Sequence, residues 1–286
     1  MVTKIRASGL EALELSSLLL QRRRLADPDG GLWEAADVQW WWRKPSRSDD
    51  VERPFWLDDD GPVAGVLISA DGDGCQIDPI VVPGALPIET VFAAALEIGQ
   101  AHAPGGFEIP VDDHDTALRR LVADAGLTAG YTDSTAWLRA DERGEVRAPA
   151  DGFTVVDRSQ RTEAQHPLLK RAGEGVVQRL GQCTLYDPEL DLAVESADGQ
   201  TAGYALFWAD PATLVGLVEP VRVEDDFQRR GLASTLVTAG VARLAARGME
   251  RIKISFGSEA AGATYRGVGF VPTSTTTWYG DTSATP

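Results

Sequence analysis

The spacing of apolar residues divides the first half of the chain into helices and strands. Residues 10–24 carry leucines at helical spacing and end at a run of Asp, Pro and Gly that predicts a turn. Short apolar runs separated by Asp- and Gly-rich turns predict consecutive strands at 55–57, 63–70 and 75–82. The remaining pattern predicts helices at 88–102 and 115–125, and strands at 107–110 and 134–139.

The second half repeats this order after a polar stretch at 141–152 that contains glycines and a proline. Its pattern predicts strands and helices in this sequence: strand 153–157, helix 166–180, hairpin 190–195 and 202–208, strand 215–223, helix 231–247, strand 252–256, helix 259–266 and strand 275–279. In both halves a helix, a glycine and an apolar residue precede a Thr-rich strand. A duplicated module is therefore predicted, with residues 1–140 and 153–286 as two domains and 141–152 as their linker.

Length and composition agree with two soluble domains and exclude several function classes. The 286 residues exceed the usual size of one domain, and no apolar run reaches the roughly 18 residues that a membrane helix needs. Residues 1–20 mix charges with leucines, which indicates an amphipathic helix and not a signal peptide. Two distant cysteines, Cys75 and Cys183, and three scattered histidines form no metal-binding spacing. We expect a cytoplasmic protein with two free thiols and no metal.

The net charge is −16 with a pI near 4.6. Nucleic acid and anionic membranes are therefore poor partners. The acidic field could attract a cationic amine, although acidity more often serves solubility. The sequence leaves the oligomeric state open, with a homodimer as one outcome.

The strongest chemical signal is a strand that runs into a basic, glycine-containing loop and then into an amphipathic helix, over residues 221–244. The start of a helix presents unpaired N–H groups and a positive dipole end. Gly231 would let the backbone approach an anion closely, and the small residues Ala233 and Ser234 keep the first turn open. The pattern favours a pyrophosphate site, with an ordinary strand–turn–helix as the alternative. It is neither a P-loop nor a dinucleotide-binding glycine motif.

Two segments resemble the GNAT superfamily of acyltransferases. Residues 228–233, Gln-Arg-Arg-Gly-Leu-Ala, resemble the family's pyrophosphate loop, and residues 258–270 resemble its Asn-x-x-Ala-x-x-x-Tyr-x-x-x-Gly-Phe segment. The resemblance covers roughly residues 153–280 and implies an α/β fold with two GNAT-like modules of mixed, mostly antiparallel sheets. It also implies that acetyl-CoA, or another acyl-CoA, is the co-substrate. The residues implied to bind it lie on the strand before the loop, on the loop, on the first turn of the helix after it and at the start of the later helix: Val221, Val223, Gln228, Arg229, Arg230, Gly231, Leu232, Ala233, Ser234 and Ser258.

The resemblance also implies the reaction, which is transfer of a short acyl group to a primary amine of a small molecule or peptide. Tyr265 matches the family's tyrosine, which protonates the departing thiolate; its alternative role is packing in the core. Glu219 is the best candidate for the base because alternation along the strand puts it on the face of Val221 and Val223. The weaker candidates for the base are Glu195, Asp210 and Glu224.

The chain departs from the family pattern in places. Ser258 replaces the usual Asn, and Lys253 stands where some members carry a base on the next strand. In the first half, Pro83 and Pro87 occupy the region of the loop and remove N–H donors, and Val122 stands in place of the tyrosine. We therefore expect residues 1–140 to form a degenerate module. The alternative function is a non-catalytic CoA-binding regulatory or interaction protein.

Overall fold

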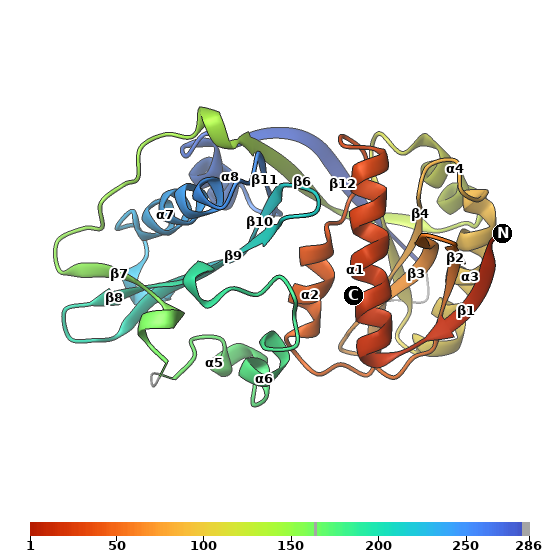
Figure 1. Ribbon diagram of the computed structural model, residues 1–286, viewed down its shortest axis with the longest axis horizontal. Coiled ribbons are helices and arrows are strands. Elements are labelled where there is room, and N and C mark those ends of the chain that lie inside the picture. Colours follow the sequence, from red (N-terminus) through yellow and green to blue (C-terminus); the bar gives the residue numbers. More distant parts are fainter. Residues whose placement is uncertain (163–164, 282–286) are drawn as a thin grey trace. The chain divides into compact units, whose positions relative to one another are not determined.

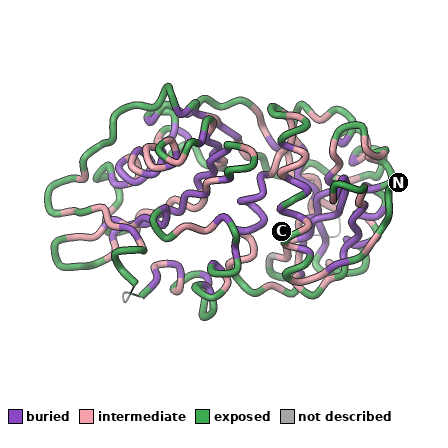
Figure 2. The backbone as a smooth tube through the Cα atoms, in the orientation of Figure 1, coloured by how far each residue is buried: buried purple, intermediate pink, exposed green. Residues whose placement is uncertain are grey.

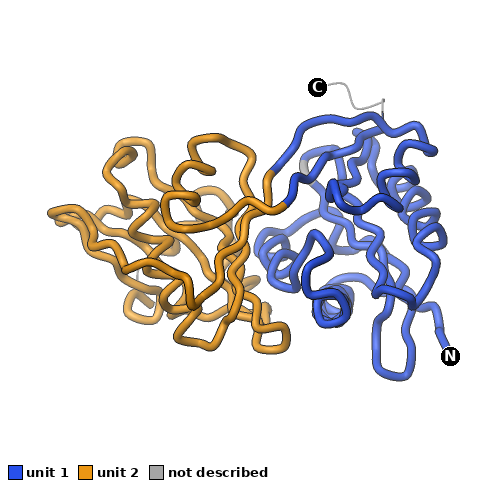
Figure 3. Tube along the Cα trace, turned by 90° about the horizontal axis from the view of Figure 1, so that it is seen from above, with its two compact units in different colours: residues 1–133, 274–286 blue, residues 134–273 orange. Residues whose placement is uncertain are grey.

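The computed structural model describes residues 1–162 and 165–281. The chain forms two compact units (Figure 3). Unit 1 consists of residues 1–133 and the segment from Ser274 onward, and unit 2 consists of residues 134–273. Strands β6 (Thr128–Arg139) and β12 (Val271–Gly280) each begin in one unit and end in the other.

Unit 1 is a sheet with the strand order β1-β2-β3-β4-β5-β12. Its strands besides β12 are β1 (Thr3–Ala7), β2 (Arg53–Asp58), β3 (Gly61–Asp71), β4 (Gly74–Val81) and β5 (Phe107–Asp112). Its helices are α1 (Gly9–Ala26), α2 (Ala35–Trp42), α3 (Ile88–His102) and α4 (Thr116–Asp124). Strands β4 and β5 pair in parallel, whereas β1 with β2, β2 with β3, β3 with β4 and β5 with β12 pair antiparallel.

Unit 2 repeats this topology with the order β6-β11-β10-β9-β8-β7. Its strands besides β6 are β7 (Phe153–Asp157), β8 (Asp191–Ser196), β9 (Thr201–Asp210), β10 (Val215–Val223) and β11 (Arg251–Phe256). Its helices are α5 (Leu169–Ala172), α6 (Val176–Leu180), α7 (Leu232–Ala246) and α8 (Glu259–Arg266), with single 3-10 turns at Ala140–Glu142, Arg158–Gln160, Pro188–Leu190 and Asp225–Phe227. Here β10 and β11 are the parallel pair.

The predicted fold class, α/β with mixed and mostly antiparallel sheets, is confirmed. In unit 2, α7 packs on β9 and β10 (Figure 1). The buried face of α7 carries Leu236, Val237 and Val241, which join Phe207 and Ile254 in one apolar core. Figure 2 shows buried backbone along β9, β10 and α7. Gly240 allows the close approach, because a Cβ built there would lie 2.1 Å from Phe207 Cζ.

Three details of the sequence prediction are wrong. Residues 3–7 form an edge strand that pairs antiparallel with β2, so the amphipathic helix expected from residue 1 begins only at Gly9. Helix α2, which contains the three tryptophans, was not predicted. The helix expected at 166–180 is broken into α5 and α6, because Gly173 and Gly175 both adopt positive φ angles that a helix does not allow.

The closing strands of the two halves are exchanged relative to the expected domains 1–140 and 153–286. Residues Ser134–Arg139 of β6 pair with β11 and belong to unit 2. Residues Thr276–Gly280 of β12 pair with β5 and belong to unit 1. The segment expected as the linker, 141–152, is largely exposed and lies within unit 2, where the Arg147 N–H donates to Thr238 Oγ1 at 3.0 Å.

Candidate active site

The central feature of unit 2 is a parallel strand pair that separates after a few residues. Strand β10 pairs with β11 only over Val215–Leu217, whereas its pairing with β9 continues to Val223. Beyond Leu217, the edge of β10 that points away from β9 has no strand partner among the described residues. Backbone donors and acceptors along this edge can therefore bind an extended ligand arm.

Glu219 lies at a β-bulge in this strand. The register of β10 against β9 shifts between Val218, which faces Phe207, and Val221, which faces Ala205. The extra residue interrupts the alternation, so the counting that placed Glu219 on the face of Val221 does not hold through the bulge. The Glu219 carbonyl accepts a hydrogen bond of 2.8 Å from Trp208 Nε1, and the Trp208 side chain is 1% exposed. A buried indole thus fixes the backbone at the bulge.

Tyr265 lies on α8 with its ring in the core of unit 2. It is 8% exposed, and its ring centroid lies 5.7 Å from that of Phe256 and 6.3 Å from that of Phe270. Burial, followed by the charge of the Glu219 carboxylate, raises the pKa of the Tyr265 hydroxyl to about 12. The two residues chosen from the sequence as acid and base therefore interact electrostatically, and the phenol is protonated at neutral pH.

The basic loop joins the end of β10 to α7 with open backbone geometry. Gly231 is the N-terminal cap of α7 at φ 77°, and Arg229 also has a positive φ of 60°. A Cβ built on Gly231 meets no atom within 4 Å, and the cap supplies no side-chain hydrogen bond to the first turn. The space beside Gly231 is therefore open, and the first N–H groups of a 15-residue helix have no intrahelical acceptor, which together suit an anion such as a pyrophosphate.

Side chains within the loop hold it in shape. The Arg230 guanidinium lies over the rings of Phe153, at 5.8 Å, and Phe227, at 5.6 Å. Asp225 accepts from Arg222 at 2.9 Å and from Gln228 Nε2 at 3.0 Å. Gln228, Arg229 and Arg230 are all exposed. Arg230 and Gln228 thus organise the loop in this structure, and Arg229 is exposed at its tip.

The remaining predicted cofactor residues, and Lys253 on the next strand, differ in how accessible their side chains are. Leu232 is buried in the core, so only its backbone is available to a ligand, and Val221, Val223, Ala233 and Ser234 are half-buried. Ser258 caps α8, because its Oγ accepts from the Ala261 N–H at 3.3 Å. Lys253, on β11, is 1% exposed and lies in register with Leu217.

The weaker candidates for the base have other partners. Glu195 forms an ion pair with Arg161. Glu224 forms a two-pronged ion pair with Arg171 of α5 at 2.7 and 3.0 Å, which lowers the pKa of the Glu224 carboxyl. Asp210 is buried and accepts from the Ala212 N–H at 2.9 Å. Arg171 was not predicted from the sequence, and no local pattern singles it out, since its partner is 53 residues away.

A buried polar group that the sequence did not reveal lies on β8 and the segment before it. Asp191 Oδ2 accepts from Tyr186 Oη at 2.8 Å and lies 2.8 Å from His166 Nε2. The Leu168 N–H donates to His166 Nδ1 at 3.1 Å, so the ring proton belongs on Nε2. The Tyr186 ring lies 6.3 Å from that of Trp208, which in turn holds the Glu219 carbonyl. The group anchors the segment that contains α5.

The corresponding region of unit 1 lacks these features. Helix α3 begins after Pro87, which is its N-terminal cap, and Val122 of α4 is fully buried in the unit 1 core. Among the residues that the structure describes, no group of three or more His, Cys, Asp or Glu side chains could hold a metal ion. Within the same residues, no helix is both long and apolar enough to cross a membrane.

Several known proteins are similar to this chain in sequence. Residues 158–270 match the model of the Acetyltransferase (GNAT) family. A mycothiol acetyltransferase of Clavibacter michiganensis subsp. michiganensis is 32% identical over 68% of this chain and 68% of its own length. Another, of Tsukamurella paurometabola, is 30% identical over 74% of this chain and 80% of its own length.

Solved structures agree on the fold. A tandem GNAT protein from the clavulanic acid biosynthesis pathway has 13% identity and a TM-score of 0.71, with both chains covered completely at 100%. A GCN5-related N-acetyltransferase from Sphaerobacter thermophilus has 17% identity and a TM-score of 0.61, over 98% of this chain and 95% of its own. The chain belongs to the GNAT family of acetyltransferases and is an acyl-CoA-dependent N-acyltransferase.

Proposed function

We propose that unit 2 holds the active centre and that unit 1 binds no CoA. The observation that carries this proposal is the geometry of β10, which carries Glu219, has an open edge beyond Leu217 and leads through the basic loop to the helix start at Gly231. Tyr265, on α8, is close enough for the Glu219 charge to raise the pKa of its hydroxyl. Unit 1 has a proline cap and a buried valine at the corresponding places. One acetyl-CoA per chain is expected, with its pyrophosphate at the loop 228–234 and its pantetheine arm along β10.

The residues of this site can carry each proton transfer when the amine attacks in its neutral form. An amine that arrives protonated first gives its extra proton to Glu219, which releases that proton to solvent before the attack. The amine nitrogen bonds to the thioester carbonyl carbon, and the bond from that carbon to sulfur breaks. Glu219 takes a proton from the amine nitrogen, directly or through one water, and Tyr265 gives its proton to the departing thiolate. Backbone N–H groups near Val221 polarise the thioester carbonyl. The proton held by Glu219 then returns through water to Tyr265, which restores both groups.

The proposed acceptor is a small molecule with a primary amine, and the mycothiol acetyltransferases among the relatives support a small-molecule acceptor over a peptide. Two relatives with this name match this chain over most of its length. The net charge of −16 favours a cationic acceptor over an anionic one. Unit 1 contributes to the acceptor site or to stability. We further propose a cytoplasmic location, in keeping with Cys75 and Cys183, which are buried and not joined in a disulfide.

Calorimetry with acetyl-CoA, followed by a panel of amines, tests the proposal. One site per chain and CoA release with a cationic small-molecule amine are expected. Two equal sites would show that unit 1 also binds acetyl-CoA. Binding without turnover of any amine would favour the alternative, a non-catalytic CoA-responsive protein.

A further inference from the structure

The β-bulge in β10 places Glu219 and Pro220 of this strand against a single residue of β9, Leu206. A bulge interrupts the regular ladder and changes the direction of the side chains that it carries. Pro220 also has no backbone N–H to donate to a neighbouring strand. The direction of the Glu219 side chain therefore depends on the groups that hold the backbone at this point, in addition to strand pairing.

One group that holds this backbone is the buried indole of Trp208. Trp208 lies on β9 in register with Leu217, and its Nε1–H donates to the Glu219 carbonyl at 2.8 Å, two residues further along β10. The side chain is almost completely buried. Loss of the donor would leave a carbonyl in this buried region without that hydrogen bond, which is unfavourable. The indole thus favours one position of the bulge.

A layer of polar groups holds the indole in turn. The edge of the Tyr186 ring packs against Trp208, and Tyr186 Oη donates to Asp191 at 2.8 Å. Asp191 lies on β8 in register with Leu206, the residue opposite the bulge, and also bonds to the buried His166. The support of the bulge therefore extends through β9 to β8.

The position of the bulge matters because Glu219 is the proposed base. A base must lie within about 2.6–3.2 Å of the atom whose proton it takes, directly or through one water. A misplacement of about 1 Å can cost about a hundredfold in rate. The Trp208 ring is buried and its N–H is bonded to the strand, so this side chain acts on the reaction through the backbone that it holds.

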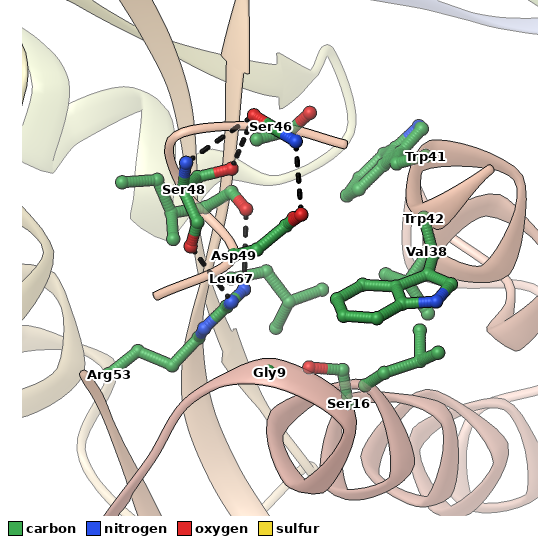
Figure 4. Close-up of a pocket in the computed structure, with 13 residues that line it drawn as sticks. Gly9, Ser16, Val38, Trp41, Trp42, Ser46, Ser48, Asp49, Arg53 and Leu67 are labelled. Atoms are coloured by element: carbon green, nitrogen blue, oxygen red, sulfur yellow. Dashed lines mark hydrogen bonds between the residues drawn. The ribbon is translucent and has the colours of Figure 1, made fainter. Parts of the chain in front are cut away.

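Tryptophans of unit 1 provide a contrast. Trp41 and Trp42 line a small pocket of about 40 Å³ between α1, α2 and β3 (Figure 4). On the opposite side of this pocket, the hydroxyl of Ser46 lies 3.0 Å from that of Ser48. These two indoles form part of a pocket wall, whereas Trp208 donates to the strand of the proposed active centre.

We propose that Trp208 is a positioning residue for acyl transfer: by holding the carbonyl at the bulge, it sets the direction in which Glu219 presents its carboxylate to the amine. In this role Trp208 contacts neither acetyl-CoA nor the amine. The inference rests on the proposed function of Glu219 as the base.

Single-turnover kinetics of the full chain test this role, with acetyl-CoA and the most active amine of the panel. Trp208→Phe should lower the rate of acyl transfer by about ten- to a hundredfold and change acetyl-CoA affinity by less than about twofold. The loss should be partly relieved at higher pH, as for Glu219→Gln. The control is Trp56→Phe, which removes another buried indole from the core of unit 1 and should lower the Tm without changing the rate.

A double variant separates positioning from general damage to the fold. In a Glu219→Gln background, Trp208→Phe should lower the rate by less than about twofold, because the base through which it acts is already missing. If Trp208→Phe does not fold, benzothienylalanine at this position replaces the indole N–H by sulfur and keeps the shape of the ring. The same loss of rate is then expected.

The inference is overturned if Glu219→Gln is slow but removal of the Trp208 N–H leaves the wild-type rate. It is also overturned if the two losses multiply in the double variant, since that result indicates general damage. A wild-type rate for Glu219→Gln would instead overturn the proposed base, and this inference with it.

Discussion

Replacing Tyr265 by Phe removes one oxygen atom from the proposed active centre and preserves the ring. The ring packs against Phe256 and Phe270, and these contacts remain in the variant. We therefore expect a change in unfolding free energy of only about 1 kcal/mol. Affinity for acetyl-CoA should also stay close to that of the wild type, because the loop and strand edge that would bind it are unchanged.

The expected effect falls on the chemical step. With a pKa of about 12, only roughly one Tyr265 hydroxyl in 10⁵ is ionised at pH 7, so the wild-type enzyme holds the proton-donating form almost completely. Phe cannot donate this proton. The turnover number should fall by on the order of ten- to a thousandfold, which corresponds to about 1.4–4 kcal/mol of activation free energy.

Single-turnover kinetics with a saturating amine measure this step, and calorimetry measures acetyl-CoA affinity in the same preparations. Glu219→Gln is the matched variant. Its deficit should be partly relieved at higher pH, where more of the amine is already neutral, whereas the deficit of Tyr265→Phe should persist. A wild-type rate for Tyr265→Phe, with chemistry shown to limit the rate, would remove Tyr265 from the mechanism.

Three further variants test other parts of the structure. Gly231→Asp should weaken acetyl-CoA binding at least tenfold in calorimetry, because its carboxylate repels phosphate and the φ of 77° strains any side chain; unchanged affinity would contradict the proposed loop site. Burial raises the pKa of Asp78 to about 7, so the folded state holds an extra proton between about pH 4 and 7, and the wild type loses stability as the pH rises through this range. Asp78→Asn should therefore be more stable than the wild type by about 2–4 kcal/mol at pH 8 and similar to it at pH 4, as urea unfolding at both pH values would show. Gly240→Ala should destabilise unit 2 by about 2 kcal/mol or more in urea unfolding, since its methyl group would overlap the Phe207 ring; an unfolding free energy equal to that of the wild type would mean that α7 moves away freely.

The sequence predicted those elements whose pattern is local. Helices α3 and α7 have long apolar faces and were found with nearly correct ends, and the turn residues marked the strands of both hairpins. Strand β1 was missed because it is a short edge strand with charged residues, and its identity depends on pairing with β2. Helix α2 was missed because adjacent tryptophans show no helical periodicity.

In the candidate site, too, local sequence patterns reveal some residues, whereas others depend on long-range contacts. Tyr265 and Gly231 stand in recognisable motifs, and Glu219 was nominated by alternation along the strand that precedes the loop. The bulge that turns Glu219 is invisible in the sequence, since it depends on the register of β10 against β9. The supports of the site, Trp208 and Arg171, depend on contacts with residues 11 and 53 positions away and carry no motif.

The exchange of closing strands determines when each unit can be completed during synthesis. Strand β5 of unit 1 obtains its neighbour on one side from residues 276–280, which the ribosome makes after all of unit 2. Until then β5 has an open edge, which is a surface prone to pairing with other chains. A fragment ending at residue 140 would keep that open edge permanently and would carry 134–139 without its partner β11. Separating the activities of the two units therefore requires point substitutions in the intact chain, because no single cut releases either unit whole.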